Sequence, residues 1–183
     1  MHRSALLQQL RAYEPDTTQE AVIRDEIISF VRANEHCFER SNPGGHLTGS
    51  AWIINSNRQR VLLVHHRKLG KWIQPGGHAD GQTDLSQVAY REALEETGIK
   101  DLRLVAPDIF DLDIHPIPVR RDEPDHFHYD VRYLFIAGPE DGPIRNHESL
   151  AVRWIDLTAV HEYNSGSSLR RMIEKIHTRF PGS

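Results

Sequence analysis

The stretch GGHADGQTDLSQVAYREALEETGI, residues 76–99, decides how the rest of the chain is interpreted. It runs from a glycine turn into a predicted helix that carries Glu92, Glu95 and Glu96. Because residues three and four apart lie on the same side of a helix, these carboxylates share an arc of roughly 100°. Like charges at this spacing destabilise a helix by about 0.2–0.5 kcal/mol per pair. We therefore expect a counter-ion beside them.

An arbitrary cluster of three glutamates is most often a solvated acidic face. Here Leu85, Ala89 and Ala93 form an apolar stripe that overlaps the carboxylate arc, so the glutamates should lie at the edge of the core. A hard divalent cation would satisfy them there, since Mg²⁺ prefers oxygen ligands and usually keeps waters and substrate phosphates.

Composition indicates one ordinary globular domain. The 183 residues are 26% charged and 38% hydrophobic, with a net charge of −4, which is unlike a general nucleic-acid or membrane binder. Cys37 is the single cysteine, so we expect no internal disulfide, a buried and inert thiol, and a reducing compartment. The first residues lack the apolar core of a signal peptide and no apolar run reaches 18 residues, so we expect a cytoplasmic protein.

The apolar pattern predicts helices at both ends and strands between them. Residues 3–12 and 18–34 are predicted helices, the second starting at Thr17 or Thr18, and a break follows at residues 41–45. The predicted strands are residues 47–55, 60–66, 102–107, 109–119, 126–138 and 151–157, and residues 168–180 form a closing amphipathic helix. This order is typical of an α+β protein or of an α/β sandwich with a mixed sheet.

Residues 77–99 resemble the Nudix box, G-x5-E-x7-R-E-U-x-E-E-x-G-U, in which U is aliphatic. Gly77 is the first glycine, and residues 91–99 fill the second half without a mismatch. Thr83 stands where the family has its first glutamate. Glu148, six residues before Trp154, also resembles a glutamate that many Nudix hydrolases carry on a loop before a strand.

The resemblance implies an α/β fold of the Nudix type, an α/β/α sandwich with a mixed sheet. The likeness extends over roughly residues 46–157, and we expect the domain to comprise residues 43–183, preceded by a helical N-terminal extension over residues 1–42. The implied activity is hydrolysis of a nucleoside diphosphate linked to another moiety, with Mg²⁺ or Mn²⁺ as cofactor and a small-molecule diphosphate as substrate. The implied metal ligands are Glu92, Glu95, Glu96 and the Gly76 carbonyl, and Glu148 is either a further ligand or the general base. Glu92, Glu95, Glu148 and Arg91 are then the catalytic residues.

Thr83 raises the question of what holds Arg91, which in the family pairs with the first box glutamate. Asp84 or Asp80 could replace that partner, and Thr83 itself is expected to be the N-cap of the helix. Because the other box glutamates are intact, we expect activity to survive.

Several further residues are candidates for substrate binding, each with a plainer alternative. Trp72 could stack on a base or belong to the core. Alternation along the predicted strand 126–138 gives its polar residues a common face, which favours a polar cleft wall over a second metal site. The substrate-binding candidates are Trp72, Arg120, His126, His128, Asp130 and Arg132.

Two other functions compete with hydrolysis. One is a sensing module that binds a nucleotide diphosphate without turnover, supported by Thr83 alone. The other is isopentenyl-diphosphate isomerase, a Nudix relative that uses a cysteine. Neither nucleic acid nor membrane is an expected partner, and the N-terminal segment could cover the cleft or form a homodimer interface.

Overall fold

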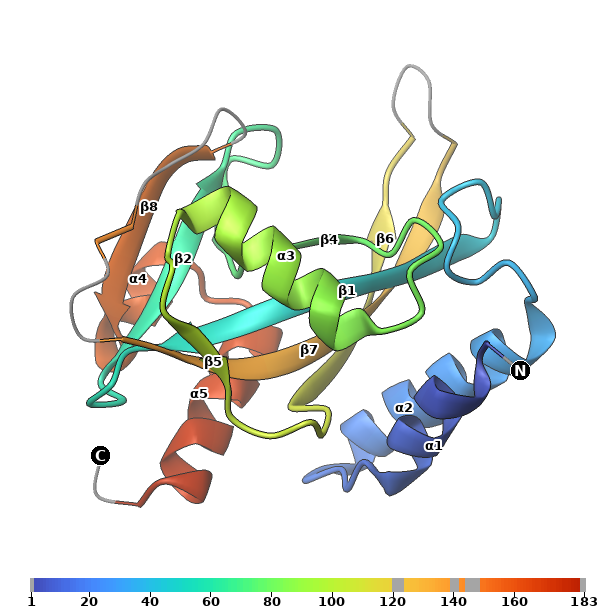
Figure 1. Cartoon of the computed structure of the whole chain (residues 1–183), viewed down its shortest axis with the longest axis horizontal. Helices are drawn as coiled ribbons and strands as arrows, with labels where there is room; N and C mark the ends of the chain where they lie inside the picture. Colours follow the sequence, from blue (N-terminus) through green and yellow to red (C-terminus); the bar gives the residue numbers. More distant parts are fainter. Residues whose placement is uncertain (1, 120–123, 139–141, 144–148, 182–183) are drawn as a thin grey trace. The chain divides into compact units, whose positions relative to one another are not determined.

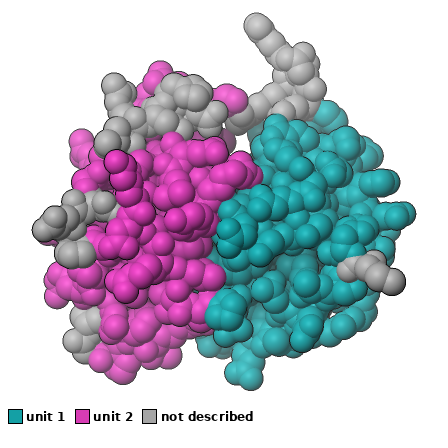
Figure 2. All heavy atoms as spheres, in the orientation of Figure 1, with its two compact units in different colours: residues 1–50, 76–89, 107–133 teal, residues 51–75, 90–106, 134–183 magenta. Residues whose placement is uncertain are grey.

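The computed structural model describes residues 2–119, 124–138, 142–143 and 149–181. Its contacts divide the chain into two units (Figure 2). Unit 1 comprises residues 1–50, 76–89 and 107–133, and unit 2 comprises residues 51–75, 90–106 and 134–183. Three elements contribute residues to both units, namely β1 (Gly45–Ile54), α3 (Leu85–Thr97) and β7 (His126–Ala137).

Unit 1 begins with two helices that lie side by side, α1 (Ser4–Ala12) and α2 (Thr18–Ala33) (Figure 1). Arg3 Nη1 donates to the carbonyls of Val31, Arg32 and Asn34, which satisfies acceptors that the end of α2 leaves without helical partners. At the other end, the Thr17 hydroxyl caps α2 by accepting from the Glu20 N–H. Arg3 therefore fixes the start of α1 to the end of α2, and Thr17 closes the first turn of α2.

The helical pair packs on the strands of unit 1. The ring of Phe30 on α2 stacks on that of Tyr129 on β7, with centroids 3.7 Å apart and planes 10° apart. The Tyr133 hydroxyl donates to Gln9 Oε1 at 3.3 Å, and Gln9 Nε2 donates to the Pro107 carbonyl. The N-terminal extension is thus present as predicted, and its aromatic and polar contacts dock it on the sheet.

Two antiparallel pairings complete unit 1. β4 (Gly76–His78) pairs with β1, with Thr48 opposite His78 and Ser50 opposite Gly76. β6 (Asp111–Ile117) pairs with β7 over its whole length, with Asp111 opposite Arg132, Asp113 opposite Asp130 and His115 opposite His128. This register sets polar side chains of neighbouring strands against each other.

Unit 2 is built on β2 (Arg60–His66), which pairs with β8 (Ser149–Asp156) and β3 (Lys71–Ile73). β5 (Leu102–Leu104) pairs with the end of β7. A short 3-10 helix (Leu157–Ala159) and α4 (Val160–Tyr163) then lead to α5 (Ser167–Arg179). α5 buries Leu169, Met172 and Ile176, which recur at helical spacing.

The α/β class predicted from the sequence is confirmed. Hydrogen bonds join the strands in the order β3-β2-β1-β7-β5, with β4 on β1, β6 on β7 and β8 on β2. The predicted hairpin is also present, since Ile54 pairs with Val61 across a turn where Asn55 Oδ1 accepts from two backbone N–H groups. Within the part of the chain that the structure describes, no helix has both the length and the apolar character that a membrane span needs.

The glycine turn predicted at residues 75–77 is wrong, because Gly76 and Gly77 lie in β4. Glycine is unusual in a strand, but here the two backbones approach closely. A Cβ on Gly76 would collide with the hydroxyl of Ser50 on β1. The glycines therefore serve a close strand pairing, and the turn follows at residues 80–81.

Candidate functional site

The box helix α3 starts at Leu85, and its N-cap is Asp84. Asp84 Oδ1 accepts from the backbone N–H of Ser86 at 3.1 Å and of Gln87 at 3.3 Å, which are the second and third residues of the helix. The prediction that Thr83 is the N-cap is therefore wrong by one residue. Thr83 lies exposed just before the cap.

One side of α3 is buried, and its three glutamates differ in their exposure to solvent. The predicted apolar stripe of Leu85, Ala89 and Ala93 is confirmed, since each is at most 1% exposed. Glu95 is exposed, Glu92 is half-buried and Glu96 is only 7% exposed. The three carboxylates of unit 2 thus run from solvent to the edge of the core, as the overlap of stripe and arc predicts.

Arg91 forms an ion pair with its neighbour on the helix. Its Nη1 lies 2.7 Å from Oε1 of Glu92, and the Arg91 side chain is 41% exposed against 16% for Glu92. Adjacent helical residues do not normally face each other, so the long arginine side chain must bend along the helix to reach this carboxylate. The contact restrains the orientation of Glu92.

The two aspartates considered as substitutes for the missing box glutamate have definite contacts within unit 1. Asp84 caps α3, as described above. Asp80 pairs with Arg40, whose Nε donates to Asp80 Oδ1 at 2.6 Å, and Asp80 has a positive φ of 47° in the loop before the helix. Both residues thus stabilise the approach to α3.

The helix ends where the box requires a glycine. The Gly98 N–H donates to the Leu94 carbonyl at 2.9 Å, and Gly98 has φ of +67°. A residue with a side chain is strained in this left-handed conformation, whereas glycine is not. The glycine therefore ends α3 directly after its acidic turn.

The donor set on α3 fits a hard divalent cation. Three carboxylates with no nitrogen or sulfur donor among them match the oxygen ligands that Mg²⁺ and Mn²⁺ prefer. Gly76 belongs to unit 1, and Glu148 lies outside the described residues, as does Arg120.

Trp72 belongs to an aromatic cluster in unit 2. It stacks on His65, with centroids 5.0 Å and planes 10° apart, and meets Tyr163 edge to face at 5.4 Å. The Arg153 guanidinium lies 5.7 Å from the centroid of the Trp72 ring, and the Trp72 carbonyl accepts a hydrogen bond from Asn164 Nδ2. The half-buried indole is thus packed on several sides by its own unit.

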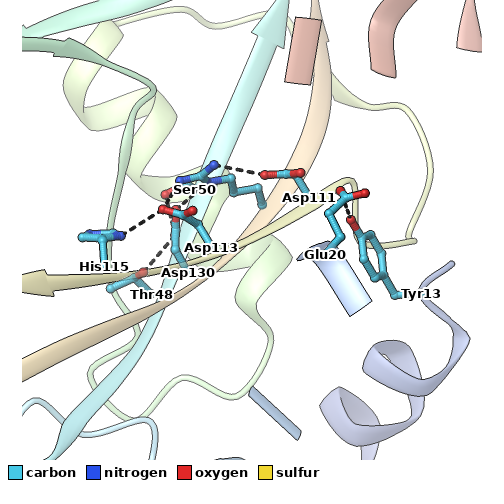
Figure 3. Close-up of polar contacts among 9 residues, drawn as sticks. Tyr13, Glu20, Thr48, Ser50, Asp111, Asp113, His115 and Asp130 are labelled. Carbon is cyan, nitrogen blue, oxygen red and sulfur yellow. Dashed lines mark hydrogen bonds and ion pairs between the residues drawn. The ribbon is translucent and has the colours of Figure 1, made fainter. Parts of the chain in front are cut away.

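Asp130 and Arg132 lie in a buried ion network in unit 1 (Figure 3). Arg132, 3% exposed, donates to Asp130, Asp111 and Asp113 at 2.8, 3.0 and 3.0 Å. Asp130 Oδ1 also accepts from the hydroxyls of Thr48 and Ser50. Burial opposes charge on Arg132, but the aspartates outweigh it and raise its pKa above the ordinary value.

A second polar contact in unit 1 fixes the start of α2. Glu20 is fully buried, its Oε1 accepts from the Tyr13 hydroxyl and its Oε2 from the Asp16 N–H (Figure 3). These bonds close the connection between α1 and α2. Glu20 is thus a structural carboxylate.

His126 and His128 belong to a cluster of histidines whose proximity was not predicted from the sequence. We call His46, His78, His115, His126 and His128 the histidine cluster. His46 lies on β1 and His78 on β4, and their rings are 4.8 and 5.1 Å from that of His128. The signal was the high count of twelve histidines, but only strand register brings these five together.

Burial and mutual repulsion disfavour protonation in this cluster. The pKa of His46 is lowered to about 4, first by burial and then by His78 and His126. The pKa of His128 is lowered to about 2, again first by burial and then by the other four rings. Both imidazoles are therefore neutral at pH 7 and have a lone pair available.

Cys37 is fully buried in unit 1. Burial raises the pKa of its thiol to about 11, against a smaller opposing effect of Arg3. The predicted burial of this cysteine is confirmed, and a thiol with a raised pKa provides little thiolate at neutral pH.

Sequence comparison places the chain beside known hydrolases. The model of the family described as NUDIX domain matches residues 45–176. Over 135 residues the chain is 29% identical to CMP-5'-(N-acetyl-N-hydroxy-3-aminopropyl)phosphonate hydrolase of Streptomyces rubellomurinus, covering 70% of this chain and 58% of that protein. It is 38% identical over 50 residues to a putative 8-oxo-dGTP diphosphatase of Bacillus subtilis, covering 27% of this chain and 34% of that protein. The chain thus aligns with little more than half of the first relative and a third of the second.

Solved structures share the fold. A Caenorhabditis elegans Ap4A hydrolase in a binary complex superposes with a TM-score of 0.60 at 18% identity, covering 75% of this chain and 98% of that one. A NUDIX family hydrolase from Clostridium perfringens gives a TM-score of 0.55 at 23% identity, with coverage of 73% and 97%. At these identities the likeness is one of fold.

Proposed function

Because the chain belongs to the NUDIX domain family, we propose that it hydrolyses a diphosphate linkage in a nucleoside diphosphate joined to another moiety, with the help of a divalent metal ion. The observation that carries this proposal is the graded set of carboxylates on α3. Glu92, Glu95 and Glu96 all stand on one helix, between the restraining Arg91 and the terminating Gly98. The substitution at Thr83 leaves these residues untouched.

Glu92, Glu95 and Glu96 would hold Mg²⁺ or Mn²⁺, and the family pattern adds the Gly76 carbonyl and Glu148. Such an ion supplies charge neutralisation at the phosphates and lowers the pKa of a bound water. Arg91 restrains Glu92, and the buried position of Glu96 limits its rotamers. Water attack on phosphorus needs positioning and charge stabilisation more than a protein nucleophile. Either Glu92 or Glu148 serves as the general base.

The substrate panel follows from the names of the relatives. One relative is named for hydrolysis of a CMP-linked phosphonate, and another for a nucleoside triphosphate. We therefore include a CMP-linked phosphonate and CDP-linked compounds beside nucleotide sugars, dinucleoside polyphosphates and NTPs. Each of these compounds contains a phosphorus anhydride, whose negative charge a metal ion held by the carboxylates of α3 would neutralise.

The test compares three proteins with Mg²⁺ or Mn²⁺ on this panel. The wild type should release phosphate or a nucleoside monophosphate from at least one compound, and Glu96→Gln should lower kcat/KM at least about 100-fold. Glu174→Gln on α5 is the matched control, because it removes an exposed helical carboxylate of the same unit. No turnover of any compound, or equal rates for wild type and Glu96→Gln, would refute the proposal.

A metal titration gives a readout that does not depend on turnover. Calorimetry with Mn²⁺ should detect a site in the wild type and in Glu174→Gln that is weakened in Glu96→Gln. Tight nucleotide binding without product would favour the sensing module. Conversion of isopentenyl diphosphate would favour the isomerase, for which the buried and protonated Cys37 provides no support.

A further inference from the structure

The histidine cluster of unit 1 has the composition of a transition-metal site. One ring nitrogen of each of His46, His78 and His128 lies within 4.8 Å of the corresponding nitrogens of the other two. The three residues come from β1, β4 and β7, so they are held by three different strands. Imidazole nitrogen is a donor for Zn²⁺, Cu²⁺ or Ni²⁺ and not for Mg²⁺. This set is thus chemically distinct from the glutamates of α3.

His46 is the member whose environment most requires a partner. It is 2% exposed, and among the described residues neither Nδ1 nor Nε2 has a hydrogen-bond partner. A buried polar group without a partner is rare in folded proteins, because desolvation is then left uncompensated. Its ring lies 4.9 Å from that of His78 and 4.8 Å from that of His128. His46 therefore has two further imidazole rings beside it, and all three could contribute a nitrogen to one metal ion.

Hydrogen bonds of His126 determine which ring nitrogen of His128 is available to a metal ion. His126 Nδ1 lies 2.9 Å from the Pro124 carbonyl, to which only its N–H form can donate. That bond leaves His126 Nε2 as the acceptor of the 3.3 Å contact with His128 Nε2, so His128 donates there and keeps its lone pair on Nδ1. A hydrogen bond from the other ring nitrogen, which orients the ring of His128 in this way, is usual for metal-ligating histidines. His115 is oriented similarly, with Nδ1 3.3 Å from Asp113 Oδ2.

The spacing is close to that of a tetrahedral site. With Zn–N bonds of about 2.0–2.1 Å, tetrahedral ligand nitrogens lie about 3.3–3.4 Å apart. The largest separation in the His46, His78 and His128 set exceeds this by roughly 1.5 Å, which small rotations of imidazole side chains can close. A cavity of about 280 Å³, lined in part by His46, His78, His126 and Arg40, adjoins the rings. It leaves room for water or another ligand in the fourth position.

We propose that His46, His78 and His128 bind a divalent transition-metal ion of the zinc type, with the fourth position facing the cavity. The ion would join β1, β4 and β7 beside His115, whose partner Asp113 also pairs with Arg132. It would also engage a buried nitrogen of His46.

The test is zinc binding to the full chain without a polyhistidine tag. The protein is stripped with a chelator, dialysed, and titrated with Zn²⁺ by calorimetry in millimolar Mg²⁺, so that Mg²⁺ occupies the carboxylates of α3. We expect one equivalent of Zn²⁺ with a Kd of about 1 μM or below. His128→Gln and His78→Gln should each weaken it at least about 100-fold.

Two controls separate this site from others. His177→Gln removes an exposed histidine of α5, and Glu96→Gln removes a carboxylate of α3, so both should bind Zn²⁺ as the wild type does. Zn²⁺ should also raise the Tm of the wild type and leave that of His128→Gln unchanged. Circular dichroism verifies that each variant is folded. If His128→Gln does not fold, His78→Gln takes its place in the comparison, because His78 is only half-buried.

The proposal is overturned if the wild type binds no Zn²⁺, or if a folded variant of His78 or His128 binds it as tightly as the wild type. It is also overturned if Glu96→Gln abolishes the Zn²⁺ signal, since the ion would then be held by α3.

Discussion

Replacing Arg132 with methionine should lower the free energy of unfolding more than the same replacement at an arginine whose ion pair is equally short but exposed to solvent. Its guanidinium is 3% exposed and donates to three carboxylates at 2.8–3.0 Å. Methionine keeps much of the side-chain volume but leaves Asp111, Asp113 and Asp130 without that positive charge. Breaking a buried ion pair by removing one partner typically lowers stability by about 3–5 kcal/mol. We expect a loss in this range.

Arg60 offers a control with the same bond in a different environment. Its Nε lies 2.8 Å from Oδ1 of Asp156, the same distance as Arg132 Nε to Asp130 Oδ2. The Arg60 and Asp156 side chains are 55% and 60% exposed, however, and exposed pairs contribute about 0–1 kcal/mol. Arg60→Met should therefore lose less than about 1 kcal/mol. Burial, and not bond length, would account for the difference.

Urea unfolding at pH 7, followed by circular dichroism, measures both variants. For a chain of this size a loss of 3–5 kcal/mol lowers Tm by roughly 6–20 °C, which a thermal scan detects independently. Raising the salt concentration should leave the Arg132→Met deficit nearly unchanged, because buried pairs are weakly screened. If the two variants lose the same free energy, or if Arg132→Met loses under about 1 kcal/mol, the network does not stabilise the fold as argued.

Four further substitutions test local features. Asp84→Ala should lower the free energy of unfolding by about 1 kcal/mol and Thr83→Ala by less than about 0.5, and equal losses in urea titrations would contradict the N-cap assignment. The neutral Cys37 thiol contributes stability that is fully present below pH 9 and is lost at about 1.4 kcal/mol per pH unit as pH rises toward 11. The stability difference between wild type and Cys37→Ala should therefore be constant below pH 9 and shrink above it, whereas parallel curves would exclude the raised pKa. Gly98→Ala, at φ of +67°, should lose about 1–2 kcal/mol in thermal melts, and no loss would mean that the helix end rearranges.

The sequence predicted the elements whose determinants are local. The bounds of α1, α2 and β2 agree with the predictions to within one residue at each end, because the local apolar pattern indicates all three and Thr17 caps the start of α2. The stripe of α3 and the exposure of its glutamates also follow from helical geometry alone. Thr83 failed as the N-cap because the next residue, Asp84, has an equally good capping side chain, and the sequence does not distinguish the two.

The remaining failures, and the contacts that the sequence did not predict, depend on strand register. Alternation gave His126, His128, Asp130 and Arg132 a common face, but which residues of other strands oppose them is set by pairing over long sequence distances. That pairing sets Asp111 against Arg132, and the strand packing brings His46 and His78 to His128. For the same reason β4 was mistaken for a turn, since its glycines were interpreted without the partner strand that requires them.

The two candidate metal sites differ in their donor atoms, which are carboxylate oxygens on α3 and imidazole nitrogens in the histidine cluster. This difference allows activity data to be assigned to one site or the other. A chelator removes both ions, so loss of turnover after chelation does not say which ion was needed. Mg²⁺ does not suit imidazole, so Mg²⁺ added alone refills only the carboxylates of α3. Zn²⁺ binds nitrogen and oxygen donors alike, and limiting Zn²⁺ in excess Mg²⁺ therefore populates the histidines first. Turnover that follows Mg²⁺ while Tm follows Zn²⁺ would assign catalysis to α3 and stabilisation to the histidine cluster.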